Sequence, residues 1–205
     1  RGLGDVYKRQ PPLLIAILCV MGMLQLMQVD YKTYNAGGQY ISYLLTPATV
    51  CLAVPLYRQL TLLRKNLKAV VIGIVSGVLA SMVSVLIFAK LFGLSHSEYV
   101  TLLPKSITTA IGMGVSEELG GVVTITVAVI VITGVLGNVI SDLVCKLFRL
   151  EEPVAKGLAL GTAAHAIGTA KAMELGEIEG AMSSLAIAVA GLLTVVTSSV
   201  FASLM

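Results

Sequence analysis

The sequence has 205 residues, of which 57% are hydrophobic and only 12% are charged, and its formal net charge is +3. A soluble domain carries roughly 25% charged residues, so this composition excludes an ordinary water-soluble fold. The small net charge gives no reason to expect a nucleic-acid partner. The three cysteines are widely spaced and form no CxxC pair, which predicts packing residues; neither a metal nor another cofactor is expected.

The first eleven residues differ in character from the rest of the chain. The run RGLGDVYKRQ resembles translated adapter sequence at the end of a metagenomic reading frame, and such scars are set aside in fold reasoning. We therefore expect residues 1–11 to be non-native, the native amino terminus to be missing, and residues 12–205 to form a single transmembrane domain.

Seven apolar segments can be drawn along the chain. Three long runs contain no Asp, Glu, Lys, Arg or His, and about 20 apolar residues are enough to cross a bilayer core of roughly 30 Å. The sequence thus predicts an all-α polytopic transmembrane protein. The predicted segments are 12–29, 40–57, 68–92, 99–115, 121–145, 154–173 and 181–204.

The first two segments are separated and interrupted by helix-disfavouring residues. Asn35, Gly37 and Gly38 favour irregular backbone in a turn over residues 30–39. Pro47 lies inside the second segment, where it removes a backbone donor and predicts a break.

The charges set the expected topology. The basic loop 58–68 should lie in the cytoplasm, so the third segment carries the chain out; the next basic loop, 146–156, should also be cytoplasmic. Two full crossings between them would break that rule. We therefore expect segment 99–115, which holds Pro104 and Lys105, to be re-entrant.

An offset of 56 residues relates two parts of the chain. Residues 110–120 and 166–176 agree at six of eleven positions, and each copy is followed by an uncharged segment. If one segment of each unit is re-entrant, each unit crosses once and the copies are inverted, a recurrent transporter design. The predicted repeat units are 99–145 and 154–204.

The first polar segment, LLPKSITTAIGMGVSEELGG, predicts an anion site. A lysine at membrane depth normally has a partner or a task, and hydroxyls and free helix amides bind anions. The alternative is that Lys105, six residues after Tyr99, simply extends its side chain to the membrane surface. The proposed contacts are Lys105, Ser106, Thr108 and Thr109, with helix breaks at Pro104 and Gly112.

The second polar segment places a histidine between two glycines, in GTAAHAIGT. The glycines predict a helix break or a close backbone approach, and a neutral histidine can both donate and accept hydrogen bonds. Lys171 is expected to be a second anion contact or a surface charge. The proposed contacts are Thr162, His165, Gly168 and Thr169, with a break at Gly161. No HExxH, GxSxG or P-loop motif is present, so an enzyme is not expected.

The stretches YNAGGQYISYLLTPATVCLAVPLY, LLPKSITTAIGMGVSEELGG and GLALGTAAHAIGTAKAMELGEIEGAMSSLA resemble the LrgB/CidB family, and the resemblance runs from about Pro12 to the end. Two positions depart from the family pattern: Thr46 stands where the family has Gly, and Ala110 where it has Pro. The helix breaks near these positions are expected to differ from those of the family.

The resemblance implies two functions. One is transport of small monocarboxylates such as pyruvate, glycolate or glycerate, as for the plastid relative. The other is holin/antiholin-like control of murein hydrolases and cell lysis. The implied setting is the bacterial cytoplasmic membrane, crossed several times. The expected partners are the lipid bilayer, a small organic anion, an LrgA/CidA-like small membrane protein and a second copy of the chain.

Overall fold

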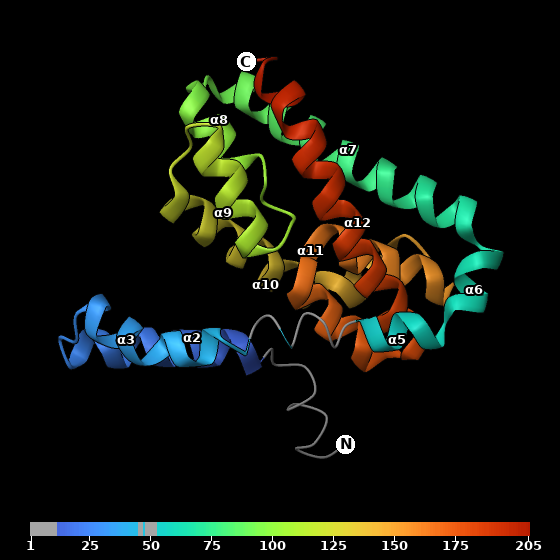
Figure 1. The fold of residues 1–205 in the computed structure, drawn as a ribbon, viewed down its shortest axis with the longest axis horizontal. Helices are drawn as coiled ribbons and strands as arrows, with labels where there is room; N and C mark the ends of the chain where they lie inside the picture. The colour runs from blue at the N-terminus through green and yellow to red at the C-terminus, as the bar shows by residue number, and fades with distance from the viewer. Residues whose placement is uncertain (1–11, 45–46, 48–52) are drawn as a thin grey trace. The chain divides into compact units, whose positions relative to one another are not determined.

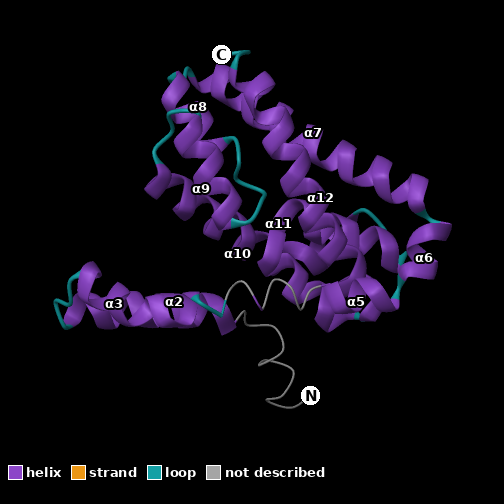
Figure 2. Ribbon diagram, in the orientation of Figure 1, coloured by secondary structure: helices purple, strands orange, loops and turns teal. Residues whose placement is uncertain are grey.

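The computed structural model of the chain describes residues 12–44, 47 and 53–205. Every regular element in these ranges is a helix, which confirms the predicted all-α class (Figure 2). The expected scar at residues 1–11 and the family departure at Thr46 lie outside the described residues. The chain divides into two compact units, Arg1–Val54 and Pro55–Met205.

In the first unit the predicted turn over residues 30–39 is wrong. Helix α2 spans Pro12–Leu26 and helix α3 spans Tyr31–Ser42, so Asn35, Gly37 and Gly38 are helical rather than breaks. The Asp30 carboxylate accepts the backbone N–H of Lys32 at 3.2 Å and thereby begins α3. Each glycine costs about 1 kcal/mol relative to alanine inside a helix, and α3 tolerates that cost.

Pro47 has helical backbone, but its immediate neighbours lie outside the described residues, so the break predicted there stays a prediction. Two short helices follow, α5 (Ala53–Arg58), which crosses the boundary between the units, and α6 (Leu60–Lys65). They lead directly into the first long helix.

Three helices of the second unit are long and apolar enough to cross a membrane: α7 (Leu67–Phe92), α10 (Val123–Leu147) and α12 (Glu177–Ala202). Their 25 or 26 residues give each a length of about 38 Å at 1.5 Å per residue. They coincide with the charge-free segments of the sequence. The chain is therefore built as a membrane protein.

The segment between α7 and α10 folds into a helical hairpin. Helix α8 (His96–Leu102) and helix α9 (Thr109–Glu118) are joined by non-helical residues 103–108, which include Pro104. The Ser97 hydroxyl donates to the Gly120 carbonyl at 3.1 Å, so the start and the end of the segment lie together. We call residues 96–120 the first hairpin and residues 103–108 its tip.

Helix α11 (Pro153–Leu175) is also a hairpin, because its backbone is not helical at Ala164 and His165. His165 has φ 43° and ψ −134°, and a β-carbon added to Gly168 would collide with the Leu160 carbonyl across the fold. Gly157 approaches the backbone of Glu179, so the start of α11 lies beside the start of α12. We call residues 153–175 the second hairpin and residues 162–165 its tip.

The two hairpins enter the bundle from opposite ends. The Tyr99 hydroxyl donates to the Phe201 carbonyl at 2.9 Å, which fixes the first hairpin beside the last turns of α12 (Figure 1). At the opposite end of α12, Gly180 packs against Met173 of the second hairpin. The long helix α12 therefore contacts both hairpins.

Gly112 and Gly161 are close helix contacts and not breaks, and for Gly161 this is the close backbone approach that the sequence also allowed. Gly112 lies within α9, and a β-carbon there would collide with the Ile130 side chain of α10. Gly161 lies in the helical first limb of α11 against the Ser183 backbone of α12. Both positions need a small residue so that the neighbouring helices can pack closely, which is a common role of glycine in membrane helices. The breaks themselves fall at residues 103–108 and at Ala164–His165.

Candidate binding site between the hairpin tips

The tips of the two hairpins meet near the middle of the long helices. The first tip reaches Ser81, which lies fourteen residues after the start of α7 and eleven before its end. The second tip reaches α10 at Gly134, eleven residues after the start of α10 and thirteen before its end. Gly77 of α7 in turn contacts Thr162.

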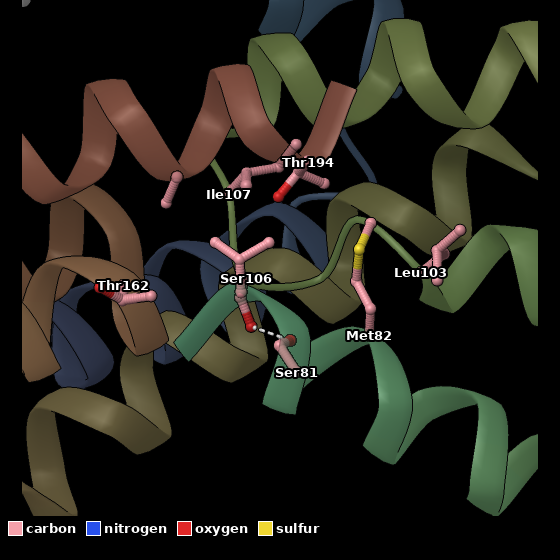
Figure 3. Close-up of a pocket in the computed structure, with 9 residues that line it drawn as sticks. Ser81, Met82, Leu103, Ser106, Ile107, Thr162 and Thr194 are labelled. Atoms are coloured by element: carbon pink, nitrogen blue, oxygen red, sulfur yellow. Dashed lines mark hydrogen bonds between the residues drawn. The ribbon is translucent and has the colours of Figure 1, made fainter. Parts of the chain in front are cut away.

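A small cavity separates the tips (Figure 3). Its volume is about 10 Å³, which is room for about one water molecule. Residues of the first tip, of the second tip and of the two helices α7 and α12 form its wall. They are Val78, Ser81, Met82, Leu103, Ser106, Ile107, Thr162, Ala190 and Thr194.

Lys105 is the charged residue beside this cavity, although it is not among the residues that line it. Its Nζ donates to the Ser81 hydroxyl at 3.1 Å and to the Ser106 hydroxyl at 3.0 Å, and the two hydroxyls lie 3.0 Å apart. Within the described residues no carboxylate forms an ion pair with Lys105. These hydrogen bonds hold the ammonium group against α7 instead of at the membrane surface. Tyr99, the residue expected to mark that surface, has a fully buried side chain.

Thr108 and Thr109 begin helix α9 at the first tip. Thr108 is the residue before the helix, and among the described residues its side chain makes no cap hydrogen bond to the first backbone N–H groups of α9. The start of a helix carries partial positive charge. Lys105 and α9 thus bring positive potential to the same tip, although neither threonine lines the cavity.

The other predicted contacts lie on the far side of the second hairpin. The His165 ring is buried, its Nε2 donates to the Ile130 carbonyl of α10 at 2.9 Å, and it does not line the cavity. The Thr169 hydroxyl lies 2.7 Å from that of Ser183 on α12, and Gly168 packs between the hairpin limbs. The structure therefore separates these three residues from Lys105, Ser106 and Thr162.

Lys171 is engaged by carboxylates at the end of the bundle. Its Nζ lies 3.5 Å from Asp142 and 3.8 Å from Glu174. This arrangement fits the surface-charge alternative rather than a second anion contact. A similar ion pair, 3.7 Å long, joins Arg58 to Glu177 at the start of α12.

Sequence reasoning misses two cavity residues with polar side chains. Ser81 stands out in the sequence only as one member of a small-residue face with Gly73 and Gly77, because its hydroxyl carries no signal of its own in a charge-free helix. Thr194 lies in the charge-free run of α12, where Ser and Thr are common and no spacing distinguishes one from another.

Comparison with known proteins places the chain in one family. The model of the LrgB-like family matches residues 7–204. Proteins named antiholin-like protein LrgB from Bacillus mycoides (strain KBAB4), Bacillus cereus (strain B4264) and Bacillus anthracis (strain CDC 684 / NRRL 3495) are each 40% identical over 190 residues, covering 93% of this chain and 83% of theirs. No solved structure gives a significant match. The chain belongs to the LrgB-like family.

Proposed function

We propose that this protein transports small monocarboxylates across the membrane through a site between the two hairpin tips. The observation that carries the proposal is Lys105, an ammonium group at mid-bundle with two hydroxyl partners and, within the described residues, no carboxylate in ion-pair contact. A lysine at the membrane centre costs about 2.5–3.5 kcal/mol on insertion scales. A bound substrate anion would supply the negative charge that no carboxylate of the described residues provides to Lys105.

The hairpin arrangement supports transport over a passive pore. Each hairpin is followed by one long helix, and the hairpins enter from opposite ends, as two inverted units with re-entrant segments would. Broken helices that meet at mid-membrane are a recurrent transporter site. Non-helical backbone at that depth is tolerated where it is buried in protein or lines a cavity.

The distribution of charge supports a multi-pass chain in the bacterial cytoplasmic membrane. Gly73 near the start of α7 packs against Leu158 of the second hairpin, so the basic loops before α7 and before α11 lie at the same end of the bundle. With one re-entrant hairpin between them, both loops face the cytoplasm, as the positive-inside rule requires.

A second candidate function rests on the names of the relatives. They are called antiholin-like proteins, which favours a regulator of murein hydrolases and cell lysis that acts with an LrgA/CidA-like small membrane protein or as a homo-oligomer. A regulator of this kind would change lysis without any substrate-dependent flux. Flux therefore discriminates between the two functions.

Uptake of labelled pyruvate or glycolate into proteoliposomes tests the proposal. We expect uptake by the unaltered protein and at least a tenfold loss in Lys105→Gln, because the glutamine amide keeps the length and polarity but not the charge. Lys90→Gln is the matched control, since Lys90 is exposed near the end of α7 and its loss should leave uptake unchanged. Equal uptake by Lys105→Gln and the unaltered protein would contradict the site, and no uptake at all would contradict transport.

A further inference from the structure

We infer that Thr194 is a specificity-determining residue of the cavity, which selects monocarboxylates that carry a second oxygen atom close to the carboxylate. This inference rests on the proposed transport function. It concerns a residue on α12, away from the charged end of the site, and it predicts which of two nearly identical anions the protein prefers.

Thr194 is a buried residue whose hydroxyl has no partner. The residue is 4% exposed and lines the cavity, yet within the described part of the chain its Oγ1 makes no hydrogen bond. On the same helix, the Thr197 hydroxyl donates to the Leu193 carbonyl at 2.6 Å and the Ser198 hydroxyl donates to the Val195 carbonyl at 2.8 Å. Such local bonds are the usual fate of a helical hydroxyl, and Thr194 departs from it.

The hydroxyl is directed into the cavity. Figure 3 shows its oxygen pointing toward the space between α12 and the first tip, where Ser106 and Ser81 are joined by their hydrogen bond. The oxygen faces the cavity and is not sealed among side chains, so a bound ligand or a water molecule there can supply the hydrogen bond that it lacks. Thr194 is therefore available to a ligand in a way that the bonded hydroxyls of α12 are not.

The two polar ends of the cavity define the ligand. Lys105 does not itself line the cavity, but its ammonium group hydrogen-bonds to Ser81 and Ser106 in the wall and makes that side the one that receives a carboxylate. Thr194 provides one neutral hydrogen-bonding group on another wall. Apart from the Thr162 hydroxyl, which donates to the Leu158 carbonyl, the remaining wall is apolar, and it offers no second positive charge. The preferred ligand is thus a small monoanion with a hydroxyl or keto oxygen, rather than a dicarboxylate or a plain fatty acid.

Competition between two matched anions tests the inference. Lactate and propionate differ by one hydroxyl, so we would measure how strongly each inhibits uptake of labelled pyruvate into proteoliposomes. We expect lactate to inhibit at about tenfold lower concentration than propionate in the unaltered protein, as a single hydrogen bond permits. In Thr194→Val, which keeps the shape and removes the hydroxyl, the two concentrations should become nearly equal.

Three further variants and one further measurement keep the test decisive. Thr194→Ser retains the hydroxyl and should keep the preference, whereas Thr194→Ala should lose it as Thr194→Val does. Ser198→Ala removes a hydroxyl one turn away that donates to the Val195 carbonyl and does not line the cavity, and it should behave like the unaltered protein. If Thr194→Val takes up no pyruvate, the thermal shifts that lactate and propionate give to the purified variant provide the same ratio.

The two proposals fail in different ways. A lactate preference that persists in Thr194→Val, or that is missing from the unaltered protein, would overturn the role of Thr194 while leaving transport intact. An unaltered protein that neither takes up nor is stabilised by any of these carboxylates would overturn the proposed function itself.

Discussion

His165 adopts a backbone conformation that side chains other than glycine rarely take. Its φ of 43° lies in the left-handed region, where a non-glycine residue costs on the order of 1–3 kcal/mol. Two contacts fix it there: its ring donates to the Ile130 carbonyl, and its own carbonyl accepts the Thr169 hydroxyl at 3.0 Å. The histidine that the sequence predicts as a ligand contact is thus, in this conformation, the residue that holds the second hairpin against α10.

The contact between His165 and α10 yields a prediction at Gly134. A β-carbon at Gly134 would lie 2.6 Å from Cε1 of the His165 ring, so Gly134→Ala must displace the ring and weaken its bond to Ile130. We expect a loss of about 1–3 kcal/mol in stability, as for other overpacked cores, measured as a lower melting temperature in detergent.

Gly114→Ala is the control for this prediction. Gly114 lies in α9, and a β-carbon there would meet nothing within 4 Å. Alanine is about 1 kcal/mol better than glycine inside a helix, so this variant should be neutral or more stable. Equal melting temperatures for Gly134→Ala and the unaltered protein would mean that the His165 contact does not hold the hairpin.

At the scale of the element, α8 begins with a capping box that depends on pH. The Ser95 hydroxyl accepts the Glu98 N–H at 3.3 Å, and the Glu98 carboxylate accepts the Ser95 N–H at 2.7 Å. These hydrogen bonds, the backbone one first, lower the pKa of Glu98 below its usual value. A lowered folded-state pKa stabilises the fold above the unfolded-state pKa, and that stabilisation disappears as the pH falls through the folded-state value.

We therefore expect the first turn of α8 to open more readily as the pH falls from about 5 to about 3. Hydrogen exchange of the α8 amides, corrected for the intrinsic effect of pH, measures this opening. In Glu98→Gln the side chain no longer titrates, so protection should vary less over the same range. Glu117→Gln is the control, since Glu117 is exposed at the end of α9. Unaltered acid sensitivity in Glu98→Gln would rule out the capping box as its source.

Gly73, Gly77 and Ser81 form a small-residue face of α7 that packs against the second hairpin and the first tip. Gly73 meets the flexible end of Leu158, whereas a β-carbon at Gly77 would lie 2.7 Å from the Thr162 side chain. Leu158 belongs to the first limb of the second hairpin and Thr162 to its tip. The spacing of four in Gly73, Gly77 and Ser81 predicts a packing face, and the structure identifies what the face packs against, including the first tip at Ser81.

For the molecule as a whole, sequence patterns predicted the elements better than their contacts. The three long helices follow from charge-free runs, because a membrane span is a property of local composition. The interruption near Pro104 follows from local chemistry too. By contrast, helix α3 forms despite its glycines, for which the structure shows no packing reason, since a β-carbon at Gly37 or Gly38 would meet nothing within 4 Å. The second break falls at His165 and not at Gly161, which packs closely against Ser183 of α12.

The candidate site depends still more on contacts between distant residues. Lys105 and Ser106 were predictable because a charged residue at membrane depth is costly wherever it lies. Ser81 and Thr194 were not predictable, because their role follows only from sharing a cavity with Ser106. Ser106 lies 25 positions from Ser81 and 88 positions from Thr194 along the chain. The separation of His165 from the cavity was equally hidden, because sequence does not say which side of a hairpin faces which helix.

The size of the cavity has a consequence for the whole molecule. A space of about 10 Å³ holds about one water molecule and cannot hold a three-carbon carboxylate. If the proposed function is correct, the first tip must therefore separate from α7 or α12 during each transport cycle. The hydroxyls of Ser81 and Ser106, 3.0 Å apart, mark the contact that opens when the first tip leaves α7.

A disulfide across that contact should stop transport. In a chain whose native Cys19, Cys51 and Cys145 are replaced by alanine, Ser81→Cys with Ser106→Cys needs only a small adjustment to reach a sulfur separation of about 2.05 Å. We expect oxidation to abolish pyruvate uptake and reduction to restore it, because the bond holds the tip closed. If the reduced protein transports nothing, slower bond formation in the presence of pyruvate reports the same opening.

A second pair of cysteines locates the movement. The Thr169 and Ser183 hydroxyls lie 2.7 Å apart and join the second hairpin to α12, where Gly157, Gly161 and Gly180 already bring the two elements into close contact. We expect these elements to move together, so cysteines at Thr169 and Ser183 should form a bond that leaves uptake unchanged. Continued uptake after complete oxidation of the Ser81–Ser106 pair would show instead that the first tip stays on α7 and that substrate passes elsewhere.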